Sequence, residues 1–139
     1  QNALRGAFRV LQVVGATTAT STSTTSATFA TTTLTATITP SSSSSKILVT
    51  SSLFLFITTA ATEGATQLVR GATQIAVHFP LRSSADNLGI TDSFMILDSP
   101  ATTAATTYTV NARRASGAGS VTSQSNSSTS GILLMEISA

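Results

Sequence analysis

The residue types that most often carry catalysis are few in this chain and widely spaced. Its 139 residues include one histidine, five acidic residues and no cysteine. Hydrolysis by general acid and base uses two positioned carboxylates or a histidine with a tuned pKa. Asp86, Asp92 and Asp98 lie in segments with turn character, where Asp hydrogen-bonds its own backbone. We expect these three to shape turns, with a weak Ca²⁺ site made by two of them as the alternative.

The single histidine, His78, is also not expected to form a metal or catalytic site. A zinc site takes three or four protein ligands, so this side chain would need carboxylates or copies of itself from other subunits. We expect a packed or strand-surface histidine, with no metal and no cofactor. Serine is abundant, but no G-x-S-x-G nucleophile elbow occurs. The sequence therefore predicts a protein without enzymatic activity.

Charge is scarce along the whole chain. Charged residues make up 9% of the sequence, against about 25% in an average protein. The net charge is +2, and the nearest approach to a basic cluster, Arg113-Arg114, is interpreted as a solvated strand end. We expect no nucleic-acid partner, and the absence of an apolar run of about 18 residues predicts no membrane span. So few charges also indicate that identical subunits cover part of the surface.

The elements that must position these residues are predicted to be strands. Thr is frequent, and this β-branched residue fits a pleated sheet better than a helix. Gly, Pro, Asn and Asp punctuate the apolar segments at short intervals, which is typical of a β-sandwich or jelly roll. The expected strands cover residues 8–14, 27–38, 46–58, 66–70, 73–79, 93–97, 105–114, 120–125 and 131–138.

Two of these segments carry the strongest apolar character. The segment 53–57 is apolar at every position, so its strand is expected at the centre of a sheet or between a core and a neighbouring subunit. The segment 132–137 closes the chain in a similar way. The candidate residues for the subunit interface or core are Leu53, Phe54, Leu55, Phe56, Ile57, Ile132, Leu134 and Ile137.

Several segments follow one another in a recognisable order. They are 9–14 before a Thr-rich stretch, 37–40 and 45–49 around a Ser run, 68–75, 94–100, 103, 105–108 and 134–137. In this order and spacing the chain resembles a group of tailed-phage virion proteins, common in marine and freshwater phages including cyanophages, that occur as fibre-like or head-decorating domains. The resemblance implies an all-β fold, a single jelly-roll-like antiparallel β-sandwich of about eight strands. It also implies a homotrimer on the exterior surface of the phage particle, with other virion structural proteins as partners.

This resemblance leaves two roles open, a tail or collar fibre and a capsid-decorating cement protein. Residues 1–15 are expected to form an N-terminal attachment segment and first strand, and residues 16–139 the β-sandwich domain. The alternative class is a carbohydrate-binding or host-receptor-binding β-sandwich module. In that case, the loop at residues 86–92 would contact a host surface glycan.

Overall fold

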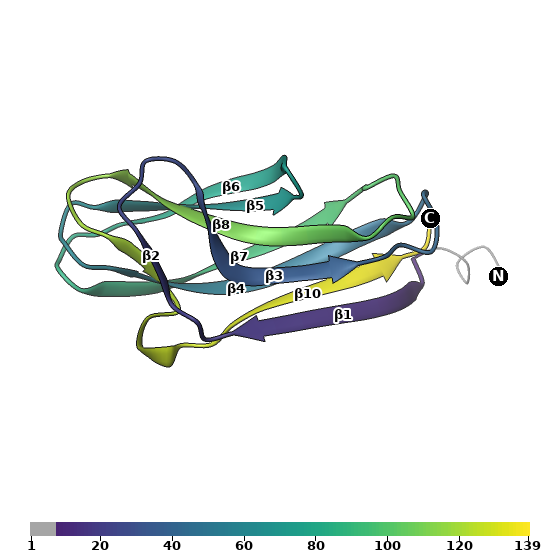
Figure 1. Cartoon of the computed structure of the whole chain (residues 1–139), viewed down its shortest axis with the longest axis horizontal. Coiled ribbons are helices and arrows are strands. Elements are labelled where there is room, and N and C mark those ends of the chain that lie inside the picture. Colours follow the sequence, from purple (N-terminus) through teal and green to yellow (C-terminus); the bar gives the residue numbers. More distant parts are fainter. Residues whose placement is uncertain (1–7) are drawn as a thin grey trace.

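The computed structural model describes residues 8–139, and the regular secondary structure of these residues is almost entirely β-strand (Figure 1). One short 3-10 helix, η1, covers Ser125–Ser127 in this part of the chain. The strands are β1 (Val10–Thr18), β2 (Thr22–Thr24), β3 (Ala30–Ile38), β4 (Lys46–Ile57), β5 (Glu63–Arg70), β6 (Thr73–Arg82), β7 (Leu88–Asp98), β8 (Thr106–Ser116), β9 (Val121–Ser123) and β10 (Ser130–Ile137).

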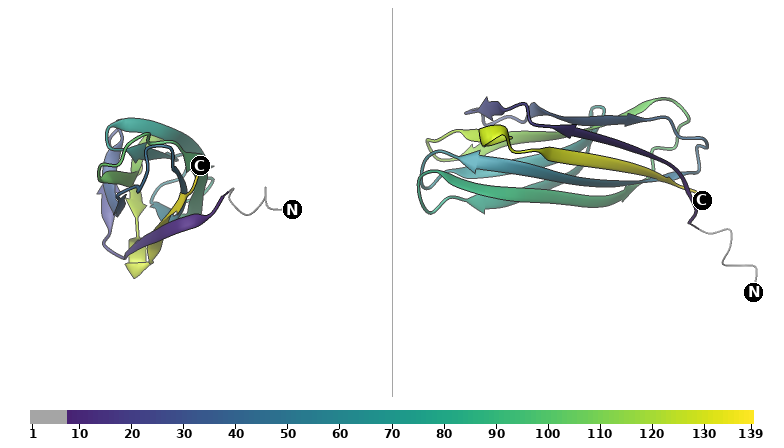
Figure 2. Two further views of the ribbon diagram at one scale, coloured as in Figure 1. Left: turned by 90° about the vertical axis from the view of Figure 1, so that its right-hand side faces the viewer. Right: turned by 90° about the horizontal axis from the view of Figure 1, so that it is seen from below.

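The strands form two antiparallel sheets. Sheet A has the order β1-β10-β4-β7, with the short strand β9 paired to the end of β4 and β2 paired to β9. Sheet B has the order β3-β8-β5-β6. In the right-hand view of Figure 2, β1 and β10 lie side by side along the length of the sandwich. The expected all-β sandwich is confirmed, with eight long strands and two short ones.

The pairing of the long strands is nested. β5 pairs with β6 across the turn at Gly71-Ala72, and around this hairpin β4 pairs with β7, β3 with β8 and β1 with β10. The chain is therefore connected like one long hairpin that has been rolled into two layers, which is the jelly-roll topology.

The core lies between the two sheets, and the alternation of burial along β4 shows how it is built. Ile47, Val49, Leu53, Leu55 and Ile57 point inward and are buried, as is Ser51, while residues 48, 50, 52, 54 and 56 point to the outer face of sheet A. Side chains alternate between the two faces of a strand. A segment that is apolar at every position therefore places apolar side chains on both faces of the sheet. The inner set packs against residues of sheet B that include Leu34, Leu68, Tyr108 and Val110.

All the expected strands are present, but several bounds differ: β1 runs to Thr18 instead of Val14, and β5 begins at Glu63 instead of Thr66. Pro80 was expected to end its strand, but β6 continues to Arg82. The reason is that β6 pairs only with β5 in the described structure, and an edge strand tolerates the missing N–H of a proline. β7 begins at Leu88 instead of Ser93, because its first half pairs with the end of β4.

The first strand belongs to sheet A. β1 runs over Val10–Thr18 and pairs with β10, so the expected boundary between residues 15 and 16 falls inside this strand. The earlier part of the expected attachment segment, residues 1–7, lies outside the described residues.

Candidate functional site

The outer face of sheet A carries a band of exposed or half-exposed apolar side chains. The strand register aligns Val13, Met135, Leu48 and Leu97 in one row across all four long strands. Leu133 and Met95 occupy the next row, on either side of Thr50. Met95 is 76% exposed, Val13 54% and Leu97 53%. These residues, the apolar band, are Val13, Leu48, Met95, Leu97, Leu133 and Met135.

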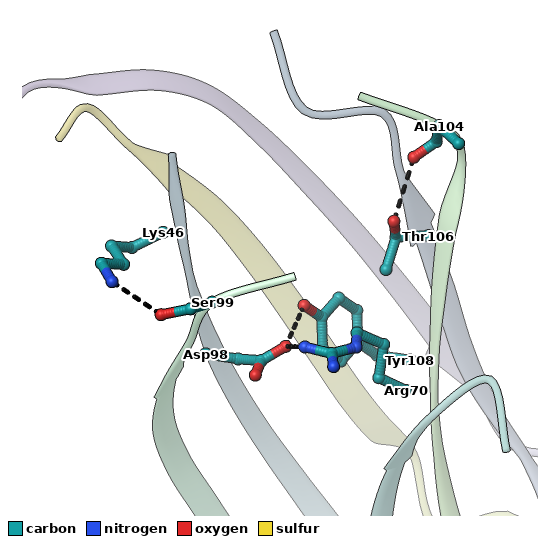
Figure 3. Close-up of polar contacts among 7 residues, drawn as sticks. All are labelled: Lys46, Arg70, Asp98, Ser99, Ala104, Thr106 and Tyr108. Carbon is teal, nitrogen blue, oxygen red and sulfur yellow. Dashed lines mark hydrogen bonds and ion pairs between the residues drawn. The ribbon is translucent and has the colours of Figure 1, made fainter. Parts of the chain in front are cut away.

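The apolar band has almost no charge around it. Among the described residues of β1, β4, β7 and β10, Lys46 is the one charged side chain at an outward position, and it lies at the end of β4. Its Nζ donates a hydrogen bond to Ser99 Oγ at 2.7 Å (Figure 3). Contiguous apolar patches are uncommon on free monomers and mark interaction surfaces. The face is therefore the strongest candidate functional surface of the described chain.

A shallow groove lies beside the apolar band on the same face. It has a volume of ≈ 510 Å³ and a mostly apolar lining contributed by β1, β10 and β4. The groove exists because Gly131 has no side chain and stands between Thr17 and Ser52 in the register. Leu133, on the same strand, forms one wall. This feature, called the recess below, is lined by residues 15–17, 50–52 and 131–133.

Two phenylalanines extend the apolar surface toward the other end of β4. Phe54 and Phe56 point outward and are half-buried. The ring of Phe54 covers Gly89 on β7, where an added Cβ would lie only 2.7 Å from the ring's Cζ. Gly89 therefore provides the space in which this ring lies flat on the sheet.

The outer face of sheet B differs in being mostly polar. Pairs of threonines bond across β3 and β8, with Oγ1–Oγ1 distances of 2.9 Å for Thr35–Thr109 and 2.7 Å for Thr37–Thr107. Gln67 on β5 accepts a hydrogen bond from Asn111. These threonine and amide side chains form hydrogen bonds with one another. The two faces of the sandwich therefore have different chemistry, one suited to solvent and the other to a partner.

Arg113 on this polar face is not the solvated strand end expected from the sequence. Its guanidinium carbon lies 5.0 Å from the ring centre of Phe29 and 5.7 Å from that of Phe79. The guanidinium also donates to the carbonyl oxygen of Ala27. Cation–π contact with two rings holds the side chain half-buried on the sheet.

The one fully buried carboxylate, within the described residues, is that of Glu136 on β10. Its Oε1 accepts from the backbone N of Ser41 at 2.8 Å and from Ser41 Oγ at 2.7 Å, and its Oε2 accepts from Gln12 Nε2 at 2.6 Å. Burial alone would raise the pKa of Glu136, but the hydrogen bonds from Ser41, Gln12 and Ser45 outweigh it and lower the pKa to about 2. The carboxylate therefore fixes the loop after β3 to the sheet.

Asp98 joins the two sheets at the same end of the sandwich (Figure 3). Its Oδ2 accepts from Arg70 Nη1 at 2.6 Å and from the phenol of Tyr108 at 2.7 Å. Burial, followed by the hydrogen bond to Asp98, raises the pKa of Tyr108 above its ordinary value. All three groups are engaged with one another, which indicates a structural role for this carboxylate.

Asp92 has a similar arrangement near the middle of β7. Thr66 donates to its Oδ2, and its Oδ1 lies 3.2 Å from His78 Nδ1. The ring of His78 stacks on Phe94 at a centroid distance of 4.1 Å. Asp86 accepts from the backbone N of Ala60 at 2.7 Å. Within residues 8–139, no three His, Cys, Asp or Glu side chains are grouped as a metal site would require.

The interface or core candidates from the sequence divide between two surfaces. Phe54, Phe56 and Ile137 point to the outer face of sheet A. The other five are buried between the sheets, namely Leu53, Leu55, Ile57, Ile132 and Leu134.

Most of the apolar band lies outside the residues that the sequence predicts for an interface. The residues 94–97 are apolar at every position, like 53–57, and this signal could have identified Met95 and Leu97. Val13 and Leu133 join them only through strand pairings between the two ends of the chain, so their shared surface was not visible in the sequence.

In comparison with known proteins, the chain matches no family model and no curated sequence. The part of the chain described by the structure has no helix whose length and apolar character would allow it to cross a membrane.

Proposed function

We propose that this chain is a non-enzymatic structural subunit of a tailed-phage virion that forms homotrimers on the particle's exterior through the outer face of sheet A. The observation that carries the proposal is the uncovered apolar band. It crosses all four long strands of sheet A, and each copy of the chain offers the same uncharged surface to another copy. Jelly rolls recur among viral capsid proteins, which supports the role by analogy.

A non-enzymatic role is supported by how the ionisable side chains are used. Asp92, Asp98 and Glu136 accept hydrogen bonds from neighbouring strands and loops. The carbohydrate-binding alternative has weaker support, because most of the loop expected at residues 86–92 belongs to strand β7. Asp86 binds the backbone of a neighbouring loop, and Asp92 points inward to Thr66.

Light scattering after size-exclusion chromatography tests the proposal. The whole chain is expected to elute as three 14.1 kDa copies, about 42 kDa. Leu97→Lys or Met95→Lys places a charge in the apolar band and is expected to give a folded monomer, because an unpaired charge is costly to bury. Thr107→Lys on the exposed face of sheet B is the matched control and should remain trimeric.

A monomer for the unchanged chain would refute the assembly. Locating the protein on particles by gold-labelled antibody distinguishes capsid decoration from a tail or collar fibre. Absence of label from purified virions would refute the virion role.

A further inference from the structure

The loop between β9 and β10 presents an exposed asparagine that is followed by a serine. Asn126 and Ser127 belong to the short helix η1, outside both sheets, and both residues are exposed. Their backbones are left-handed, with φ angles of 54° and 58°. Asparagine tolerates this conformation better than most residues that have a side chain. The turn therefore accounts for the backbone of Asn126, while its side-chain amide lies at the surface.

This loop is held to the sandwich at its two ends by one residue of β4. The backbone N of Gln124 donates to the carbonyl oxygen of Phe54 at 3.0 Å, and the backbone N of Phe54 donates to Ser130 Oγ at 3.1 Å. Residues 125–129 lie between these two attachments and outside the strands on either side. Their backbone can rotate without opening a strand pairing, so local motion here costs less free energy than in a strand.

We propose that the position of Asn126 in this loop makes it a site of spontaneous covalent modification through a cyclic imide. The backbone N of Ser127 attacks Cγ of Asn126, a C–N bond forms, and the side-chain amide leaves as ammonia with the proton that the attacking nitrogen loses. Water then opens the imide at either of its carbonyl groups, which gives aspartate or isoaspartate. The product lowers the net charge of +2 by one unit. This modification does not depend on the proposed assembly.

Two other asparagines within the described residues provide the comparison. Asn87 is also exposed, but it is followed by Leu88, the bulky first residue of β7, which pairs with Ile57. Asn111 is buried in β8 between β3 and β5, and its side chain donates to Gln67. At both positions the attack would distort a strand pairing. Of these three asparagines, Asn126 alone combines an exposed amide with a small following residue outside a strand.

Peptide mass spectrometry of the whole chain after incubation in mildly alkaline buffer tests the proposal, because the attacking nitrogen must lose its proton. Cleavage after arginine places Asn126 in the peptide 115–139, apart from Asn87 and Asn111. Replacement of NH₂ by OH should be faster at Asn126 than at the other two by about tenfold or more, a barrier difference of about 1.4 kcal/mol. Both aspartate and isoaspartate peptides are expected. An unchanged Asn126, faster conversion at Asn87 or Asn111, or aspartate as the sole product would overturn the proposal.

Substitutions of the following residue test the attacking atom and the importance of the loop. Ser127→Gly adopts a positive φ freely and leaves the attacking nitrogen unhindered, so it should accelerate the conversion. Ser127→Leu should slow it, since it reproduces the Asn-Leu sequence of residues 87–88. Leu88→Ser is the matched control in a strand and should leave Asn87 slow. Equal rates in the two Ser127 variants would show that this nitrogen does not attack. An Asn87 as fast as Asn126 in Leu88→Ser would show that the loop does not determine the site.

Discussion

Replacing Glu136 by Gln tests how a buried charge holds the jelly roll together. The ionised carboxylate accepts hydrogen bonds from Ser41 and Gln12, which lower its pKa from 4.5 to about 2. A carboxylate with a lowered pKa contributes stability above its unfolded pKa, and this contribution disappears as the pH falls through the folded pKa. The wild-type chain should therefore lose this contribution between about pH 5 and pH 2.

The expected difference in stability follows from the size of the pKa shift of Glu136. A change from 4.5 to about 2 corresponds to about 3 kcal/mol, since one pKa unit is about 1.4 kcal/mol. A glutamine resembles the protonated acid at every pH. Glu136→Gln should therefore be less stable than wild type by about 3 kcal/mol at pH 6, and the two should converge near pH 2.

Urea denaturation followed by far-UV circular dichroism at pH 6, 4, 3 and 2 measures this difference. Both proteins carry Leu97→Lys, so that subunit association does not contribute to the apparent stability. Glu63→Gln, at a partly exposed carboxylate, is the control and should show a much smaller difference. A stability difference that stays constant between pH 6 and pH 2 would refute the reasoning, as would no difference at pH 6.

Three further substitutions distinguish the core from the outer face and test the hydrogen bond between the two sheets. Leu134→Ala removes a fully buried side chain and should lower the free energy of unfolding by about 2–5 kcal/mol, whereas the neighbouring Leu133→Ala should mainly weaken association. If both alanine substitutions lowered the free energy of unfolding of the monomer equally, the result would contradict the alternation of buried and exposed side chains along β10. Tyr108→Phe leaves Asp98 with one fewer donor and should cost about 1–3 kcal/mol in urea denaturation. No measurable loss would show that water replaces the phenol.

Much of the fold could be predicted because strand formation here depends on local signals. The alternation along 105–114 and the turn at Gly71-Ala72 lie within a few residues and appear directly in the sequence. The length of β6 was not predictable in this way. Pro80 is acceptable only because β6 lies at an edge, and position in a sheet is a tertiary property.

The candidate interface was only partly predictable for the same physical reason. Local pattern shows that Leu53 and Phe54 belong to opposite faces of one strand, but not which face meets the core. The apolar band also requires the register between β1 and β10, which places Val13 beside Met135. No local signal specifies a pairing between residues so far apart in the chain.

The nested pairing of strands has a consequence for the order of folding. The β5–β6 hairpin closes the shortest loop, and each surrounding pair closes a longer one until β1 meets β10. Loop-closure entropy rises with length, so β1 is expected to dock late, with φ-values near zero for its side chains. Two of the three strands that line the recess are β1 and β10. The surface proposed for assembly is then completed only as the monomer finishes folding, so unfinished chains are not expected to associate through it.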